Sequence, residues 1–412
     1  MARRGGAVLR MKALLATHDF PPGFGGGIAT YYYELCSRLE GRISVLAPKP
    51  EGAEEFDAAQ SFQVHRRRIP QLSTGLMTKT RFPLLRLPRL MSLMAAHSLL
   101  YSSHLRKLLG SGDFATLLLG HAYLAPVGVP FRKGGKVRTG IFLHGSELNR
   151  YRNFAPVQRG LIDSLNALDF LIVNSGFTRE QYLERGVRDD HTFLVLNPGV
   201  DTAAFRPDAG DPAGMRAQLG VSDRPVVLAV ARLVECKGQD TLIRALPAIL
   251  DAAPEAVCVI GGSGPYRDGL EELARETGVH DRVVFAGWVG TDDLPSLYRM
   301  ADVMALPSRD IVPGLPIEGF GIVYLEANSC GVPVVGGREG GTGDSIEEGV
   351  SGFRVDAQSP EEVAEATVRL LSDPELRSRM GLAGRERAVE AFDWSVQAGR
   401  LRDFLDSAGV AQ

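Results

Sequence analysis

The sequence predicts an α/β protein made of two Rossmann-like, doubly wound domains that face each other across a cleft. Short apolar runs alternate with longer segments of helical spacing along the whole chain, a pattern typical of buried parallel strands joined by crossover helices. The alternation comes as two series, separated by residues 197–208, which are rich in turn formers. Two series of strand–helix units indicate two parallel sheets.

The first series lies in the N-terminal half. Its pattern predicts helices at 30–39 and 157–168, and strands at 12–17, 43–47, 116–119, 140–143 and 170–174. Residues 65–110 break the pattern, because they combine many basic side chains with leucines and methionines. Two interpretations remain open for this stretch. It is either a helical excursion with snorkelling basic side chains, or a basic and apolar patch that contacts an acceptor or a membrane surface.

The second series begins at residue 225. It predicts strands at 225–231, 256–261, 282–287, 303–307 and 333–336, with helices at 239–252, 266–277, 294–300 and 321–329. The tail repeats apolar residues at helical spacing, which predicts an amphipathic helix that covers a surface. We therefore expect an N-terminal domain at 1–203, a C-terminal domain at 204–390, and a terminal helix at 391–412 that crosses back to the N-terminal domain.

Composition and charge narrow the classes of function. The formal net charge is −3, so no general attraction to nucleic acid is expected. The four cysteines lie far apart, which indicates reduced thiols rather than a zinc site or a disulfide framework. No signal-peptide pattern follows the basic start, and no run reaches the ~18 apolar residues of a spanning helix. We expect a cytoplasmic protein, with peripheral contact at the inner membrane face as the alternative.

The strongest motif is a pair of glutamates, Glu318 and Glu326, with seven residues between them. Gly319 and Gly321 allow a tight turn into a helix whose first N–H groups face an anion. Helical spacing would separate the carboxylates by roughly 12 Å along the axis, comparable with the span from a sugar to a ribose across a diphosphate. One carboxylate would then hold sugar hydroxyls and the other the ribose diol. The alternative is a helix-terminus acid followed by a solvated helix residue.

Further candidates follow predicted strands, at the carboxyl edge where α/β sites gather. A glycine-rich loop with Gly26 and Gly27 opens a helix, so its backbone N–H groups can approach a phosphate. Arg232 and Lys237 follow the first strand of the second series and can neutralise a leaving diphosphate without a metal. His144 ends another strand of the first series, where it is either functional or a satisfied structural residue.

The segment from Glu318 to Glu326, with the ANSCGVPVVGG that follows it, resembles the family 4 retaining glycosyltransferases, which have the GT-B architecture. Within that family it is most similar to bacterial mannosyltransferases of the phosphatidylinositol-mannoside type, and the match covers essentially the whole chain. The resemblance implies that Glu318 fixes hydroxyls of the transferred sugar and that His144 faces this sugar. It also implies that Arg232 and Lys237 act on the diphosphate.

The resemblance extends to weaker positions. It implies that the nucleotide sugar contacts Gly26, Gly27, Gly262, Trp288, Val289, Gly319, Phe320, Gly321, Ile322 and Glu326. His18, Asp19 and Glu147 are candidates for contact with the acceptor. In such proteins, backbone groups around Trp288 would contact the base, so the side chains in the sequence do not identify the base. GDP-mannose and a UDP-hexose therefore both remain open as the sugar donor.

The predicted reaction is a metal-independent hexosyl transfer with retention and front-face attack, to a small-molecule, saccharide or lipid-linked hydroxyl acceptor. No cofactor is expected. A glycogen-type phosphorylase would need a pyridoxal phosphate lysine and a much longer chain, and a nucleotide-sugar epimerase would lack the glutamate pair. A sugar-binding regulatory protein on the same scaffold remains as the non-enzymatic alternative, beside a natural-product or saccharide glycosyltransferase. Neither the oligomeric state nor the linkage follows from the sequence.

Overall fold

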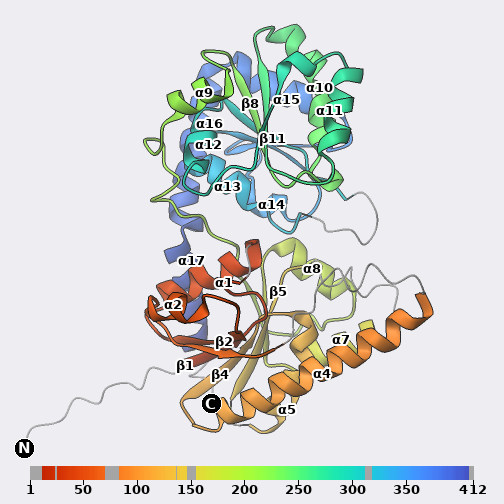
Figure 1. The fold of residues 1–412 in the computed structure, drawn as a ribbon, viewed down its shortest axis with the longest axis vertical. Helices are drawn as coiled ribbons and strands as arrows, with labels where there is room; N and C mark the ends of the chain where they lie inside the picture. The colour runs from red at the N-terminus through yellow and green to blue at the C-terminus, as the bar shows by residue number, and fades with distance from the viewer. Residues whose placement is uncertain are drawn as a thin grey trace, which may run out of the picture.

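The computed structural model describes residues 12–23, 26–69, 83–135, 137–145, 155–310 and 318–407, with the backbone alone for 83–95. Figure 1 shows two lobes, one above the other, each built on its own sheet. All strand pairs in both sheets are parallel. The predicted two-sheet α/β architecture is therefore confirmed.

The first sheet has seven strands in the order β3-β2-β1-β4-β5-β6-β7. Their bounds are β1 Lys12–Ala16, β2 Ile43–Pro48, β3 Val64–Arg67, β4 Phe114–Leu119, β5 Arg138–Leu143, β6 Phe170–Val173 and β7 Phe193–Val195. Successive side chains of a strand point to opposite faces of the sheet. Leu14 and Leu15 accordingly belong to two different hydrophobic cores, one on each face. This sheet is thus covered by helices on both faces.

Helices α1 (Gly27–Arg38) and α17 (Trp394–Ser407) supply side chains to the core on one face of the first sheet. The other face packs against α5 (Ala125–Lys133), α7 (Ala155–Asn166), α8 (Gly176–Glu184) and the C-terminal part of α4 (Pro83–Leu109). The short helices of this half are α2 (Ala53–Ala58) and η1 (Ala122–Leu124). The apolar runs are buried because helices cover both faces, as the sequence indicates.

The second sheet has six strands in the order β10-β9-β8-β11-β12-β13. Their bounds are β8 Val226–Val230, β9 Val257–Gly261, β10 Val283–Gly287, β11 Val303–Leu306, β12 Val334–Gly337 and β13 Gly352–Val355. The helices around it are α9 Pro212–Leu219, η2 Glu235–Lys237, α10 Gln239–Ala252, α11 Arg267–Glu276, η3 His280–Arg282, α12 Leu294–Arg299, α13 Ile322–Ser329, α14 Thr342–Ser345 and α15 Pro360–Ser372. In each sheet the strand order reverses beside the first strand of the series, which is where ligands of such folds bind.

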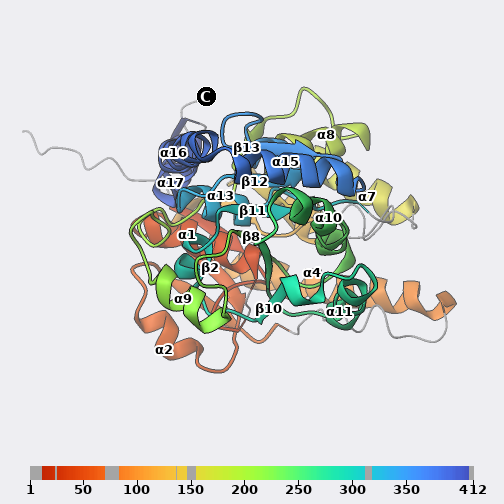
Figure 2. The same cartoon turned by 90° about the horizontal axis from the view of Figure 1, so that it is seen from above.

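The chain returns to the first lobe through α16 (Pro374–Phe392) and α17, which follow one another along the same side of the molecule in Figure 1 and Figure 2. Trp394, Ala398 and Leu401 of α17 are buried in the core shared with α1 and the first sheet. The predicted crossing helix is therefore confirmed. Within the described ranges, no helix combines the length and apolar character needed to span a membrane.

One prediction about residues 65–110 is wrong in its first part. The segment does not start as a helix, because Val64–Arg67 forms the edge strand β3 and pairs with β2. The helical part begins at Pro83 and continues to Leu109. The basic side chains of β3 hide its strand character, since the strand is only half-buried at the edge of the sheet. Residues 70–82 lie outside the described residues, so neither interpretation of the patch is tested there.

Candidate functional site

A cavity of about 410 Å³ lies between the two lobes, with walls from both. Its first-lobe side is formed by the start of α1 and the ends of β5, β6 and β7, and its second-lobe side by the end of β8 and the start of α13. The residues that line it are Gly27, Ile28, Tyr31, His144, Asn174, Pro198, Ala231, Arg232, Lys237, Glu318, Gly319, Phe320, Gly321, Ile322 and Val323. The cavity therefore collects all four predicted catalytic residues.

The glycine loop leads into α1 as the sequence predicts. Gly26 is the N-cap residue with φ of 128°, a conformation that strongly favours glycine. Gly27 is the first helical residue, lines the cavity, and has open space where a side chain would stand. The helix therefore presents its first N–H groups beside the cavity, where an anion is favoured.

His144 follows β5 and lies at the cavity wall. Tyr32 donates its hydroxyl hydrogen to the carbonyl of Gly120, and its oxygen lies 2.7 Å from His144 Nε2. Because a phenol has a single hydrogen, the second bond requires Nε2 to donate. Burial lowers the pKa of His144 to about 4, so the ring is neutral at neutral pH.

Arg232 and Lys237 follow β8, on the opposite wall. Gly238, directly after Lys237, has φ of 74°, and a Cβ there would lie 1.9 Å from the carbonyl oxygen of Pro307. Glycine is therefore required to seat this loop against the end of β11. Within the described ranges, the Arg232 guanidinium has no hydrogen bond or ion pair, whereas Lys237 Nζ lies 2.5 Å from Glu318 Oε2.

Glu318 lies before α13 rather than within it, because the helix begins at Ile322 after Gly321, which has φ of 90°. The assumption that helical rise sets the distance from Glu318 to Glu326 is therefore wrong. Gly319 packs directly against the first lobe. A Cβ there would lie 3.2 Å from the carbonyl oxygen of His144. Phe320, Gly321 and Ile322 complete this wall.

Glu326 is one turn inside α13 and is not among the residues that line the cavity. Its Oε2 accepts a hydrogen bond of 2.6 Å from the hydroxyl of the buried Tyr298. Burial raises the pKa of the Glu326 carboxyl, and this hydrogen bond opposes the rise. A solvated helix residue, the alternative from the sequence, does not fit these surroundings.

Three other positions predicted to contact the nucleotide sugar lie outside the cavity lining, namely Gly262, Trp288 and Val289. Gly262 has φ of 128°, its amide donates to the carbonyl of Gly287, and a Cβ would lie 1.9 Å from the carbonyl oxygen of Ala231. Close backbone packing thus accounts for this glycine. Trp288 is 75% exposed after β10, and the neighbouring Val289 packs on the core.

His18 and Asp19, two of the predicted acceptor residues, also lie outside the cavity lining. His18 is buried at the end of β1, where burial and the nearby His97 lower its pKa to about 4. The Asp19 amide donates to Thr17 Oγ1, and Asp19 Oδ2 lies 3.9 Å from His121 Nε2. Glu147 is outside the described residues, so its predicted contact is untested.

Asn174 is a cavity residue that the sequence interpretation missed. It follows β6, lines the cavity, and donates to the carbonyl of His144 at 3.4 Å. Its Oδ1 is buried without a hydrogen-bond partner in the described part of the chain. A buried amide oxygen of this kind can accept from a ligand hydroxyl. Its position directly after a parallel strand is the feature of the sequence that could have identified it as a site residue.

The arrangement suits a ligand that carries both phosphate and hydroxyl groups. Two cations and the N-terminus of α1 can bind phosphate oxygens, while Glu318, Asn174 and neutral His144 can bind hydroxyls. Among the described residues, no group of histidine, cysteine or acidic side chains is arranged to hold a metal ion.

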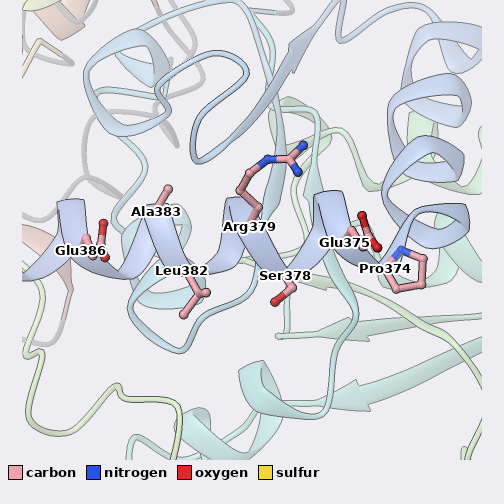
Figure 3. Close-up of a pocket in the computed structure, with 7 residues that line it drawn as sticks. All are labelled: Pro374, Glu375, Ser378, Arg379, Leu382, Ala383 and Glu386. Carbon is pink, nitrogen blue, oxygen red and sulfur yellow. The ribbon is translucent and has the colours of Figure 1, made fainter.

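A second surface hollow, of about 620 Å³, is larger than the interlobe cavity but lacks its chemistry. Figure 3 shows that its labelled residues, from Pro374 to Glu386, all lie along α16. A hollow formed along a single helix cannot surround a ligand, and it contains none of the predicted site residues. The interlobe cavity is therefore the candidate site.

Comparison with protein families assigns both halves of the chain. Residues 25–204 match the model described as Glycosyltransferase Family 4, and residues 214–387 match that described as Glycosyl transferases group 1. A GDP-mannose-dependent alpha-(1-6)-phosphatidylinositol monomannoside mannosyltransferase of Mycolicibacterium smegmatis is 36% identical, over 97% of this chain and 99% of that protein.

A second relative agrees with this assignment, and a solved structure shares the fold. The GDP-mannose-dependent monoacylated alpha-(1-6)-phosphatidylinositol monomannoside mannosyltransferase of Corynebacterium glutamicum is 31% identical, over 96% of this chain and 98% of that protein. Anabaena Alr3699/HepE, solved in complex with UDP, has the same fold, with a TM-score of 0.75 at 22% identity over 96% of this chain and all of that one.

Proposed function

This chain belongs to the glycosyltransferases of the family 4 and group 1 types, and from this premise we propose that it transfers mannose from GDP-mannose to a hydroxyl of a lipid-linked acceptor, with retention and without a metal. The observation that carries the proposal is the cavity between the lobes, which collects Arg232, Lys237, Glu318 and His144. Each of these residue types has a task in transfer from a nucleotide-diphosphate sugar.

The first part of the proposal concerns the residues that bind the diphosphate of the sugar donor. Arg232 and Lys237 stand at the end of β8, and the N-terminus of α1 faces them across the cavity. Negative charge develops on the diphosphate as the bond to the sugar breaks, and cations fixed in advance stabilise that charge without reorganisation. We assign both residues to the leaving GDP, which is also the basis for metal independence.

The sugar supplies the second part. Glu318 can accept from hydroxyls of the mannose, and His144 is neutral, so it adds no positive charge beside a developing oxocarbenium-like centre. Glu326, held by Tyr298, is assigned to the ribose diol, which requires its carboxylate to become accessible when the nucleotide binds. Trp288 and Val289 are assigned to the base, and Gly26, Gly27 and Gly262 to the neighbourhood of the diphosphate.

The names of the relatives and the chemistry of the sugar donor together support the proposal of retention. The names of both relatives contain the terms GDP-mannose-dependent, alpha-(1-6) and mannosyltransferase, which favours an α-linked product. The mannose of GDP-mannose is itself α-linked, so an α product means that the configuration is kept. We propose front-face attack, in which the leaving phosphate accepts the proton of the acceptor hydroxyl.

The acceptor is proposed from the same relatives, which act on a phosphatidylinositol monomannoside. A lipid-linked acceptor requires the protein to meet a membrane surface, so we propose a cytoplasmic protein with peripheral contact at the inner face. The acceptor hydroxyl would enter from the first lobe, where His18, Asp19 and Glu147 are the candidates.

The test compares GDP-mannose, GDP-glucose and UDP-glucose, each with and without a phosphatidylinositol-monomannoside acceptor, by release of free nucleotide. We expect turnover with GDP-mannose plus acceptor, and thermal stabilisation by GDP that grows with its concentration. A preference for UDP-glucose would overturn the sugar donor and leave a UDP-hexose transferase. Nucleotide binding without turnover under any condition would support the regulatory alternative instead.

A further inference from the structure

We propose that Asp344 is a positioning residue for the reaction. Its carboxylate forms hydrogen bonds between the two lobes, an interaction that we call the clasp, and these bonds fix one wall of the cavity. This inference rests on the proposed function for its catalytic consequence. Asp344 belongs to α14 of the second lobe, and its Oδ2 accepts two hydrogen bonds from the first lobe. One comes from the amide of Gly176 at 2.7 Å, and the other from Asn197 Nδ2 at 3.1 Å.

The first bond satisfies the beginning of a helix in the other lobe. Gly176 is the first residue of α8, whose N-cap residue Ser175 bonds only to Thr178 among the helical amides. The amide of Gly176 has no partner within the helix, and the positive end of a helix dipole favours a carboxylate. Asp344 therefore gives α8 of the first lobe a cap that exists only while the lobes are together.

The second bond leads to the cavity. Asn197 is buried, and its Nδ2 donates to the carbonyl of Asn174 at 3.1 Å as well as to Asp344. Asn174 lines the cavity and donates in turn to the carbonyl of His144. Loss of the Asp344 carboxylate would therefore loosen the position of Asn174 in the cavity wall, because Asn197 connects these two residues by hydrogen bonds.

The turn that carries Asp344 also forms hydrogen bonds with the loop of its own lobe that contains Glu318 and Phe320, which we call the sugar-binding loop. The amide of Gly341 donates to the carbonyl of Glu318 at 2.9 Å, and Ser345 Oγ donates to the carbonyl of Phe320 at 2.6 Å. Arg387 of the crossing helix α16 donates to the carbonyls of Asp344 and Ser345. The turn thus joins the sugar-binding loop, the crossing helix and the first lobe.

Opening of the cleft would break both bonds from Asp344 together, since both of its partners lie in the first lobe. Closure of domains around a substrate excludes water and completes the site in many enzymes. The clasp is therefore expected to act on turnover and on the fraction of mannose lost to water. The affinity for GDP alone should change little, because the second lobe holds most of the assigned nucleotide contacts.

The first experiment compares Asp344→Ala with Asp211→Ala. Asp211 also caps a helix, α9, by accepting from Gly214 at 2.9 Å, but it makes this bond within the second lobe. We expect Asp344→Ala to lower kcat at least about tenfold, because one charge-assisted hydrogen bond is already worth about this factor and the variant loses two. The ratio of free to transferred mannose should also increase. Asp211→Ala should keep the kcat and the ratio of the unmodified protein. Equal kcat and equal ratios for the two variants would overturn the proposal.

The second experiment exchanges the two side chains. Asn197→Asp places two carboxylates together and should lower kcat at least as much as Asp344→Ala. The double variant Asn197→Asp with Asp344→Asn restores one amide and one carboxylate across the cleft, so kcat should partly recover. A double variant no more active than Asn197→Asp would contradict the clasp.

A measurement without turnover separates this inference from the proposed function. Hydrogen exchange at the amide of Gly176 should be faster in Asp344→Ala than in Asp211→Ala, whatever the enzyme does with GDP-mannose. Unchanged exchange would overturn the clasp even in an active enzyme. Absence of turnover with faster exchange would instead overturn the proposed function and leave the clasp in place.

Discussion

The salt bridge between Lys237 and Glu318 joins two residues that we assign to different parts of the sugar donor. Both side chains are mostly buried, with 20% and 13% of their surface exposed. A diphosphate carries more negative charge than one carboxylate, so it would draw Lys237 and free Glu318 for the sugar. The pair therefore keeps two buried charges compensated until the sugar donor enters.

Replacement of Lys237 tests this assignment. Lys237→Met removes a cation from the leaving group and leaves the Glu318 carboxylate facing the diphosphate, so kcat should fall at least about 100-fold. The matched control is Lys49→Met, which removes an exposed lysine paired with Glu54 at 2.7 Å and should have little effect. Steady-state release of GDP measures both variants. A Lys237→Met enzyme with normal kcat would contradict the role in leaving-group stabilisation.

The bond from Tyr298 to Glu326 gives a pH-dependent prediction. Burial raises the pKa of Glu326, and the bond from Tyr298 lowers it, so Tyr298→Phe should raise this pKa further. The ribose diol donates to the ionised carboxylate, so affinity for GDP should increase as pH rises through the pKa of Glu326. Titration of GDP binding against pH should show this increase at a higher pH in Tyr298→Phe. Identical pH profiles would mean that Glu326 does not bind the ribose.

His144 gives a prediction about stability. Its pKa is lowered from 6.5 to about 4 in the folded protein, so between these values the unfolded chain binds more protons. The contribution of His144 to stability is therefore full above pH 6.5 and is lost as pH falls toward 4. His144→Gln should flatten the decline of Tm between pH 6.5 and pH 4. His18 shifts in the same direction, so some slope should remain, and an unaltered slope would contradict the neutral buried state of His144.

At the scale of elements, α17 connects the end of the chain to the site. Trp394 is 3% exposed, and its ring packs edge-on against Tyr31, with 5.7 Å between centroids. Tyr31 lines the cavity and contacts the ring of His144. Gly199 admits this packing, because a Cβ there would lie 2.7 Å from the indole. The helix therefore supports the cavity wall as well as covering the first sheet.

Trp394→Ala should lower the free energy of unfolding by about 3–5 kcal/mol, the usual cost of removing a buried aromatic side chain. Leu382→Ala on α16 is the matched control, because Leu382 is 62% exposed and its loss should cost little. Urea unfolding measures both variants. A Trp394→Ala protein as stable as the control would mean that α17 does not contribute to the first core.

The same scale shows which elements could be predicted. Central strands are mostly apolar, and all ten predicted strands occur with shifts of at most a few residues at their ends. The three that were missed, β3, β7 and β13, occupy sheet edges. All three are short. Basic or glycine residues interrupt the apolar pattern of β3 and β13, and β3 and β7 are only half-buried, as expected of edge strands. Helix α10 was predicted with its observed bounds because a glycine precedes it and its apolar stripe is regular.

At the scale of the whole molecule, the sequence could predict several residues that line the cavity but not all of their partners. His144, Arg232 and Lys237 were found because the carboxyl edge of a parallel sheet is recognisable in the sequence. The bond between Asn197 and Asp344 joins residues that are 147 positions apart, in different lobes, and depends on how those lobes meet. No local pattern encodes such a contact. The boundary between residues 203 and 204 stays a prediction.

One measurement tests the central claim, that the cavity between the lobes transfers mannose from GDP-mannose with retention. Proton NMR would follow the anomeric signals while the protein acts on GDP-mannose and a phosphatidylinositol-monomannoside acceptor. We predict that a new α-mannoside signal grows as GDP-mannose disappears, and that Lys237→Met slows it at least about 100-fold. A β-mannoside as the first product, or an α-mannoside formed equally fast by Lys237→Met, would contradict the account.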